Sequence, residues 1–152
     1  MRKIDQIYMS EALKEAQKAA SEDEVPVGCV IVKHKSIVAR GHNQVERLKD
    51  ATAHAEMIAI TQASSCLSSK WLNGVSVYVT IEPCSMCAGA LVLARIGRLI
   101  YGADDSKTGA CGSVTNIINN HKLNHRIKVK KGILETECSS LLKNFFSRKR
   151  TK

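Results

Sequence analysis

Two short stretches decide the fold of this chain: Thr52-Ala53-His54-Ala55-Glu56 and Pro83-Cys84-Ser85-Met86-Cys87. Each is predicted to open a helix, and together they supply one imidazole, two thiols and one carboxylate. His54, Cys84 and Cys87 form a three-ligand set with an open fourth position, which is typical of catalytic rather than structural zinc sites. Glu56 lies two residues from His54, close to the predicted metal but badly placed to bind it. We therefore expect Glu56 to carry protons.

The spacing of these residues suits the hydrolysis of an amino group on an aromatic ring. A zinc ion lowers the pKa of its bound water to about 7, which supplies hydroxide near neutral pH. The pattern H-x-E followed by P-C-x-x-C is the signature of nucleobase deaminases, in which hydroxide attacks C6 of adenine or C4 of cytosine. Glu56 would move the protons of that reaction.

Two other interpretations of the cysteine pair stay open. The first is a structural zinc site, which needs a fourth protein ligand such as Cys111 or His121, although neither has a paired spacing. The second is a redox C-x-x-C pair, which leaves the His-x-Glu stretch unexplained. Cys29, Cys66, Cys111 and Cys138 stand in apolar or small-residue surroundings, and we expect them to be buried small hydrophobes.

Length and composition indicate one globular domain over residues 1–152. The chain has 152 residues, 44% of them hydrophobic and 24% charged, and no apolar run approaches the ~20 residues of a membrane span. The first residues are polar and contain no export signal, so we expect a cytoplasmic protein without a membrane partner.

The positive charge is concentrated at the end of the chain. Residues 1–120 hold 13 Lys and Arg against 12 Asp and Glu, a net charge of +1, whereas residues 121–152 hold 10 against 2, a net charge of +8. A basic segment after a nearly neutral body favours a polyanionic partner, most simply a nucleic acid. A solvated tail that only aids solubility is the alternative.

Hydrophobic periodicity and turn residues predict the order α-β-β-α-β-α-β-(β)-α. We expect helices over residues 4–20, about 53–63 with Thr52 as N-cap, 83–94 with Pro83 in the first turn, and about 135–152; strands over 29–32, 37–39, 75–80, 98–101 and 127–129; and loops over 43–50, 64–73 and 102–113. An antiparallel hairpin combined with helix-linked strands predicts an α/β fold with a mixed sheet of about five strands and helices on both faces.

A closer resemblance extends over nearly the whole chain. It rests on the two stretches above and on Val25-Pro26-Val27-Gly28, Asn43, residues 78–90, 101–110, 124–126 and 131–134, and Phe145-Phe146. These residues resemble the bacterial tRNA-specific adenosine deaminases. The H-x-E and P-C-x-x-C pair is shared with guanine, cytosine and cytidylate deaminases. The loop around Asp105 and the Phe-Phe-basic end are what point to the tRNA enzymes.

The resemblance implies a homodimer of three-layer α/β/α, cytidine-deaminase-like subunits. It implies one zinc ion per subunit and conversion of adenosine to inosine at the wobble position of an arginine tRNA. Matched residue by residue, His54, Cys84 and Cys87 are the zinc ligands and Glu56 is the proton shuttle. The implied substrate contacts are Asn43, the backbone of Ala55, Asp105 in a loop that meets the anticodon, and Arg148 in the basic C-terminal helix.

The residues alone leave several of these roles open. Asn43 and Asp105 are equally typical of turns, and Phe145 and Phe146 fit either the core or an RNA contact. The main alternative function is deamination of a free base or nucleoside such as guanine, cytosine or cytidine, which needs the same catalytic residues but no basic end. A second alternative is a non-catalytic, zinc-stabilised binding subunit. Glu56 argues against it, because binding alone needs no carboxylate beside an open zinc position.

Overall fold

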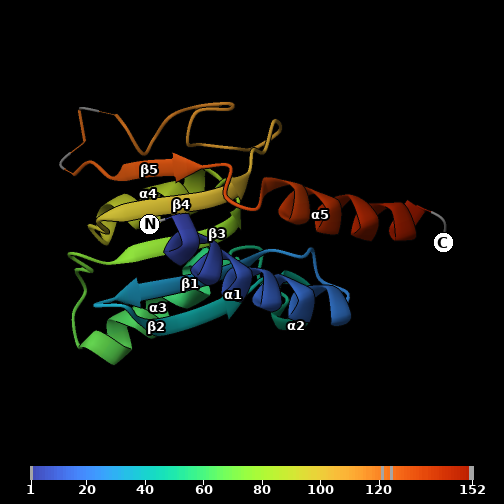
Figure 1. Cartoon of the computed structure of the whole chain (residues 1–152), viewed down its shortest axis with the longest axis horizontal. Coiled ribbons are helices and arrows are strands. Elements are labelled where there is room, and N and C mark those ends of the chain that lie inside the picture. The colour runs from blue at the N-terminus through green and yellow to red at the C-terminus, as the bar shows by residue number, and fades with distance from the viewer. Residues whose placement is uncertain (1, 121, 124, 151–152) are drawn as a thin grey trace.

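The fold is an α/β sandwich, seen in a computed structural model that describes residues 2–120, 122–123 and 125–150. Its elements follow in the order α1 (Arg2–Ser21), β1 (Gly28–Lys33), β2 (Ser36–His42), α2 (Val45–Leu48), α3 (Ala55–Leu67), β3 (Ser76–Ile81), α4 (Ser85–Leu93), β4 (Arg98–Ala103), β5 (Lys128–Lys131) and α5 (Glu135–Arg150) (Figure 1).

The five strands form one mixed sheet in the order β2-β1-β3-β4-β5. Strand β1 pairs antiparallel with β2, to which a tight hairpin joins it, and also antiparallel with β3 on its other side. Strands β3, β4 and β5 are parallel, as crossover connections require. The predicted mixed sheet of about five strands is therefore confirmed.

Helices cover both faces of the sheet, which confirms the three-layer prediction (Figure 1). On one face α3 and α4 bury alternate residues such as Ile31, Val79 and Leu99. On the other face α1 and α5 bury the residues between them, including Val30 and Tyr78. Each fully buried aliphatic side chain contributes about 1.5–3 kcal/mol of transfer free energy. The alternation of side chains along the strands therefore determines which residues each pair of helices covers.

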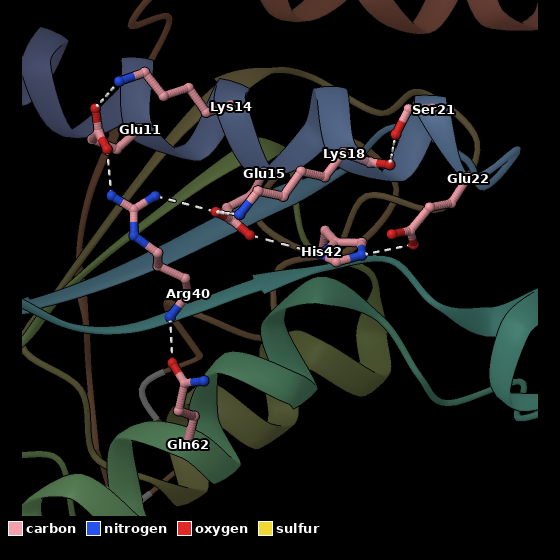
Figure 2. A network of polar contacts seen from close by, with 9 residues as sticks. All are labelled: Glu11, Lys14, Glu15, Lys18, Ser21, Glu22, Arg40, His42 and Gln62. Atoms are coloured by element: carbon pink, nitrogen blue, oxygen red, sulfur yellow. Dashed lines mark hydrogen bonds and ion pairs between the residues drawn. The ribbon is translucent and has the colours of Figure 1, made fainter.

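Helix α1 is fastened to the sheet by close packing and by charge. A Cβ atom at Gly28 would lie 2.0 Å from the carbonyl oxygen of Ala12, so the missing side chain lets the helix backbone approach β1. In the network of Figure 2, the Arg40 guanidinium on β2 donates to Glu11 and, at 3.1 Å, to Glu15 on α1. The Nε2 atom of His42 lies 3.0 Å from Glu22. The edge strand β2 is thus tied to α1.

The start of α3 differs from the prediction. His54 is the N-cap residue and the helix begins at Ala55, whereas the Thr52 hydroxyl donates to Asp50 at 2.7 Å in the preceding turn. Thr52 is therefore not the cap, because the side chain of Asp50 binds it locally. The helix also runs four residues past the predicted end at residue 63, to Leu67.

The other boundaries differ by a few residues. The predicted 43–50 loop contains the single-turn helix α2, whose backbone amides at Glu46 and Arg47 are capped by Glu24. Pro83 precedes the N-cap Cys84 and is not in the first turn of α4. The predicted final helix is observed as α5 up to Arg150. Residues 151–152, His121 and Asn124 lie outside the described residues.

Three of the four non-motif cysteines are buried as predicted, but Cys66 is exposed near the end of α3, because that helix turns this residue toward solvent. Across the described part of the chain, no helix combines the length and the apolar character needed to cross a membrane.

Candidate metal centre and substrate pocket

The predicted ligand residues meet where two helices begin. His54 and Cys84 are the N-cap residues of α3 and α4, and Cys87 lies in the first turn of α4. Helix α4 directly follows the carboxyl end of β3, the edge of an α/β sheet at which ligands commonly bind. The Nδ1 atom of His54 lies 3.6 Å from the Cys84 sulfur and 3.5 Å from the Cys87 sulfur. The structure thus brings all three residues together.

The spacing of these atoms fits a tetrahedral zinc ion. Zn–S and Zn–N bonds of about 2.3 and 2.0–2.1 Å give a tetrahedron whose S···N edges are about 3.5 Å. The observed S···N distances of 3.5 and 3.6 Å match that edge. Among the described residues, the three ligands form the group that could hold a metal, and Cys111 is not part of it. The group thus offers three ligand atoms, and two of its residues, His54 and Cys84, line the pocket.

The ligand group combines one readily ionised thiol with two groups whose protons a metal would displace. Hydrogen bonds from Cys87 and His54 lower the pKa of the Cys84 thiol to about 4. The hydrogen bond to Cys84 and the nearby charge of Glu56 raise the pKa of His54. Both cysteines stand at a helix N-terminus, where the helix dipole favours a thiolate, but the hydrogen bond to Cys84 and burial raise the pKa of Cys87. The site can therefore provide the anionic sulfur that zinc prefers, and binding a metal there releases protons.

Glu56 lies beside this group in the first turn of α3. Its side chain is buried, at 3% relative exposure, and burial raises its pKa to about 7. A carboxyl group with that pKa can both accept and release a proton near neutral pH, which is what general acid–base catalysis requires. The geometry thus places a buried carboxyl group beside the three candidate ligands.

The ligand group opens into a pocket of about 1380 Å³. In Figure 1 this end of the sheet lies on the right, between α5 and α2. Pockets for small molecules usually span about 300–1,000 Å³, so this pocket has room for more than one nucleoside. Its walls come from the turn after α1, the segment leading into α2, the first turn of α3, the end of β3, the loop after β4 and the inner side of α5.

Three of the four predicted substrate contacts line this pocket: Asn43, Ala55 and Asp105. The fourth, Arg148, is exposed on α5 and is not among the lining residues, where Lys143 and Lys149 stand instead. The two neighbouring phenylalanines differ in burial, because Phe145 is 4% exposed and Phe146 is 43% exposed, although both reach the pocket. Phe145 therefore belongs to the core and Phe146 faces solvent.

Asn43 and Asp105 both have local partners. The Asn43 amide donates to the Val25 carbonyl at 3.2 Å and accepts from the Val45 backbone amide at 3.3 Å. The Asp105 carboxylate accepts from the Lys107 and Thr108 backbone amides and from the Thr108 hydroxyl. Burial alone would raise the pKa of Asp105, but these hydrogen bonds lower it. Both residues thus make the local hydrogen bonds of a turn, the alternative role that the sequence left open for them.

Two buried carboxylates on the pocket wall were not predicted from the sequence. Glu24 and Glu82 are each 1% exposed and both line the pocket. Glu24 accepts two backbone amides at the start of α2. Glu82 accepts hydrogen bonds from the loop after β4, and these bonds lower its pKa although burial acts in the opposite direction. The one sequence signal for Glu82 is its place directly before Pro83-Cys84.

Comparisons with known proteins agree with this geometry. The sequence model described as MafB19-like deaminase matches residues 4–150. The tRNA-specific adenosine deaminase of Bacillus subtilis (strain 168) is 45% identical, over 97% of this chain and 92% of that protein. The enzyme of the same name from Aquifex aeolicus (strain VF5) is 50% identical, over 94% of each chain.

A solved structure is similar as well. It comes from a study of A-to-I editing by tRNA:A34 deaminases at the wobble position of transfer RNA, and its sequence is 42% identical to this chain. The TM-score is 0.86, and the match covers 89% of this chain and 98% of the other. Because the chain is 45–50% identical to tRNA-specific adenosine deaminases over nearly its whole length, it belongs to the family of tRNA-specific adenosine deaminases.

Proposed function

We propose that this protein hydrolyses the adenosine at the wobble position of an arginine tRNA to inosine. The observation that carries the proposal is the buried Glu56 beside an open, three-ligand His54-Cys84-Cys87 group, in a pocket larger than a single nucleoside needs. The relatives at 45–50% identity, which bear the name tRNA-specific adenosine deaminase, support the choice of substrate.

In this proposal His54, Cys84 and Cys87 hold one zinc ion per subunit. Zinc in such a site is a Lewis acid that lowers the pKa of water from about 15.7 to about 7. Glu56 accepts a proton from the attacking water and passes it to the purine ring. It then takes the second proton, from the hydroxyl group now bonded to C6, and gives it to the leaving amine, so that adenosine and water give inosine and ammonia. Burial, which raises the pKa of Glu56, favours its taking up a proton.

The anticodon loop is the proposed partner of the pocket. A base must be taken out of its stack before it can react, and this costs least in an unpaired loop. Asn43, the backbone of Ala55 and Asp105 are the proposed contacts to the anticodon nucleotides, because all three line the pocket. Arg148 would contact a phosphate further along the RNA, as part of the basic helix α5.

A homodimer and a cytoplasmic location complete the proposal. Leu93 on α4 is 80% exposed and Leu48 on α2 is 53% exposed, and a second subunit that covered either residue would remove its apolar surface from water. The cytoplasm is where a tRNA substrate would be met.

The experiment that tests the function offers several substrates to the zinc-loaded protein. They are an arginine-tRNA anticodon stem-loop with a wobble adenosine, free adenosine, cytidine and guanine. Inosine formation in the stem-loop alone is the expected result. Turnover of a free base or nucleoside with an untouched stem-loop would instead establish a small-molecule deaminase with the same catalytic residues.

A further inference from the structure

The loop after β4, residues 104–113, forms one wall of the substrate pocket. Asp104 to Thr108 line the pocket, and Asp105 is the proposed anticodon contact in this loop. The loop contains no helix or strand, and its backbone bonds are turn bonds such as that from the Gly109 amide to the Asp105 carbonyl at 2.9 Å. A side chain that joins the two ends of the loop would restrain it further, because holding a loop in one conformation costs entropy.

Glu82, the residue after β3, supplies that restraint. One carboxylate oxygen accepts the backbone amide of Asp105 at 3.0 Å and the hydroxyl of Ser113. The other oxygen accepts the backbone amides of Cys111 at 2.9 Å and of Ser113 at 3.1 Å. A single buried side chain thus binds both ends of the loop. Hydrogen bonds to an ionised acceptor are about twice as strong as neutral ones.

The loop is shaped around this carboxylate. A Cβ atom at Gly109 would lie 2.3 Å from the carboxyl carbon of Glu82 and 2.5 Å from the Asp105 carbonyl oxygen, so only glycine allows the approach. Gly109 also forms an isolated bridge with Cys84. The same contacts therefore seat the loop on the backbone of a proposed zinc ligand.

We propose that Glu82 is a positioning residue for the tRNA substrate: it holds the pocket-facing end of the 104–113 loop in the conformation that receives the anticodon. This inference rests on the proposed function and extends it to a residue that does not touch the reacting atoms. Glu82 acts through Asp105 and its neighbours, so its loss should weaken substrate binding more than it slows the chemical step.

The Glu82→Gln variant tests the inference because both carboxylate oxygens accept backbone amides. The amide nitrogen of glutamine must replace one oxygen, and it cannot accept a hydrogen bond. The nitrogen is least unfavourable next to the Ser113 hydroxyl, because that hydroxyl can rotate and accept a hydrogen bond from it. In that orientation the Asp105 amide loses its partner while the Cys111 amide keeps one. We therefore expect the loop to loosen first at Asp105.

The experiment compares wild type, Glu82→Gln and Asp5→Asn, each loaded with zinc. Asp5 is the matched control: a buried carboxylate with three hydrogen-bond donors, none of them in the 104–113 loop. Glu82→Gln should raise KM for the stem-loop on the order of tenfold, with kcat within about twofold of wild type and an unchanged zinc content. Amide hydrogen exchange at Asp105 should accelerate in the same variant. Asp5→Asn should have wild-type KM and wild-type exchange at Asp105.

A wild-type KM in Glu82→Gln, or a raised KM without faster exchange at Asp105, overturns the inference. Ser113→Ala provides a milder variant, because it removes only the hydroxyl donor from an exposed residue and should give a smaller increase in exchange. If wild type makes no inosine in the stem-loop, the proposed function fails. Exchange at Asp105 in Glu82→Gln then decides by itself whether Glu82 holds the loop.

Discussion

Buried carboxylates are stabilised differently on helix α1 and at the pocket. On α1, Asp5 pairs with Arg98 and Lys130, and Glu15 pairs with Lys18 and Arg40, so cationic side chains balance the negative charge. At the pocket, Glu24 and Glu82 accept backbone amides instead. The pocket carboxylates therefore hold loops in place without bringing lysine or arginine against the metal ligands.

This difference separates the residues that stabilise the fold from those that we expect to affect metal binding and turnover. Ion pairs on α1 fasten the helix to strands β2, β4 and β5, and the residues of these pairs do not line the pocket. Glu56 belongs to neither group of paired carboxylates, since burial rather than a cation determines its pKa. We expect substitutions on α1 to change the free energy of unfolding, and substitutions at the pocket to change metal content or turnover.

The largest effect is expected from removing a metal ligand. Cys87→Ala should lose zinc and with it all measurable deamination, because two remaining ligands hold the ion far more weakly than three. Metal analysis of the purified variant measures the loss. Cys29→Ala is the matched control, a buried free cysteine outside the ligand group, and it should keep its zinc. A Cys87→Ala protein with one zinc per chain would contradict the ligand assignment.

A large effect on stability, without one on the chemistry, is expected from Asp5→Asn. Asp5 is 4% exposed and accepts hydrogen bonds from Tyr78 at 2.6 Å and Lys130 at 2.8 Å. Its loss should lower the free energy of unfolding at pH 7 by about 2 kcal/mol. Urea denaturation checks this value, and Glu46→Gln, an exposed control, should change it by less than about 0.5 kcal/mol.

The pH dependence of the same pair of proteins sharpens this test. Burial would raise the pKa of Asp5, but the bonds from Lys130, Tyr78 and Arg98 together lower it below the ordinary value of 3.8. A carboxyl group with a lowered pKa in the folded state stabilises the fold above its ordinary pKa, and this contribution is lost as pH falls through the folded pKa. The gap between wild type and Asp5→Asn should therefore narrow below pH 3.8. A difference in the free energy of unfolding that stayed constant down to about pH 2 would refute the ion-pair explanation.

The smallest effect is expected at the partly exposed network on β2. Arg40→Ala removes the pairs with Glu11 and Glu15 (Figure 2) and should cost about 1 kcal/mol or less, with the cost shrinking in high salt. Lys14→Ala breaks only an exposed pair with Glu11 and should change stability by less than that. Denaturation at low and high salt measures both. A loss in Arg40→Ala that salt does not reduce would mean that packing of the side chain matters more than its charge.

The sequence was most informative about features that depend on the spacing of residues close together in the chain. The spacing of His54, Cys84 and Cys87 located the metal group, and the alternation in strands such as residues 75–80 located the sheet. The roles of Glu24 and Glu82 could not be predicted, because their partners lie 22 to 31 residues away in the chain. Likewise, which basic residues of α5 face the pocket depends on how that helix packs on β4.

The measurement that tests the central claim most directly compares wild type with Glu56→Gln. Glutamine has nearly the same size as glutamate but cannot carry the proton, so the variant should bind one zinc per chain as wild type does. Inosine formation in the stem-loop should fall by about 10²–10⁴-fold, the usual contribution of general acid–base catalysis. Activity within tenfold of wild type, or loss of zinc from the variant, would show that Glu56 is not the proton carrier.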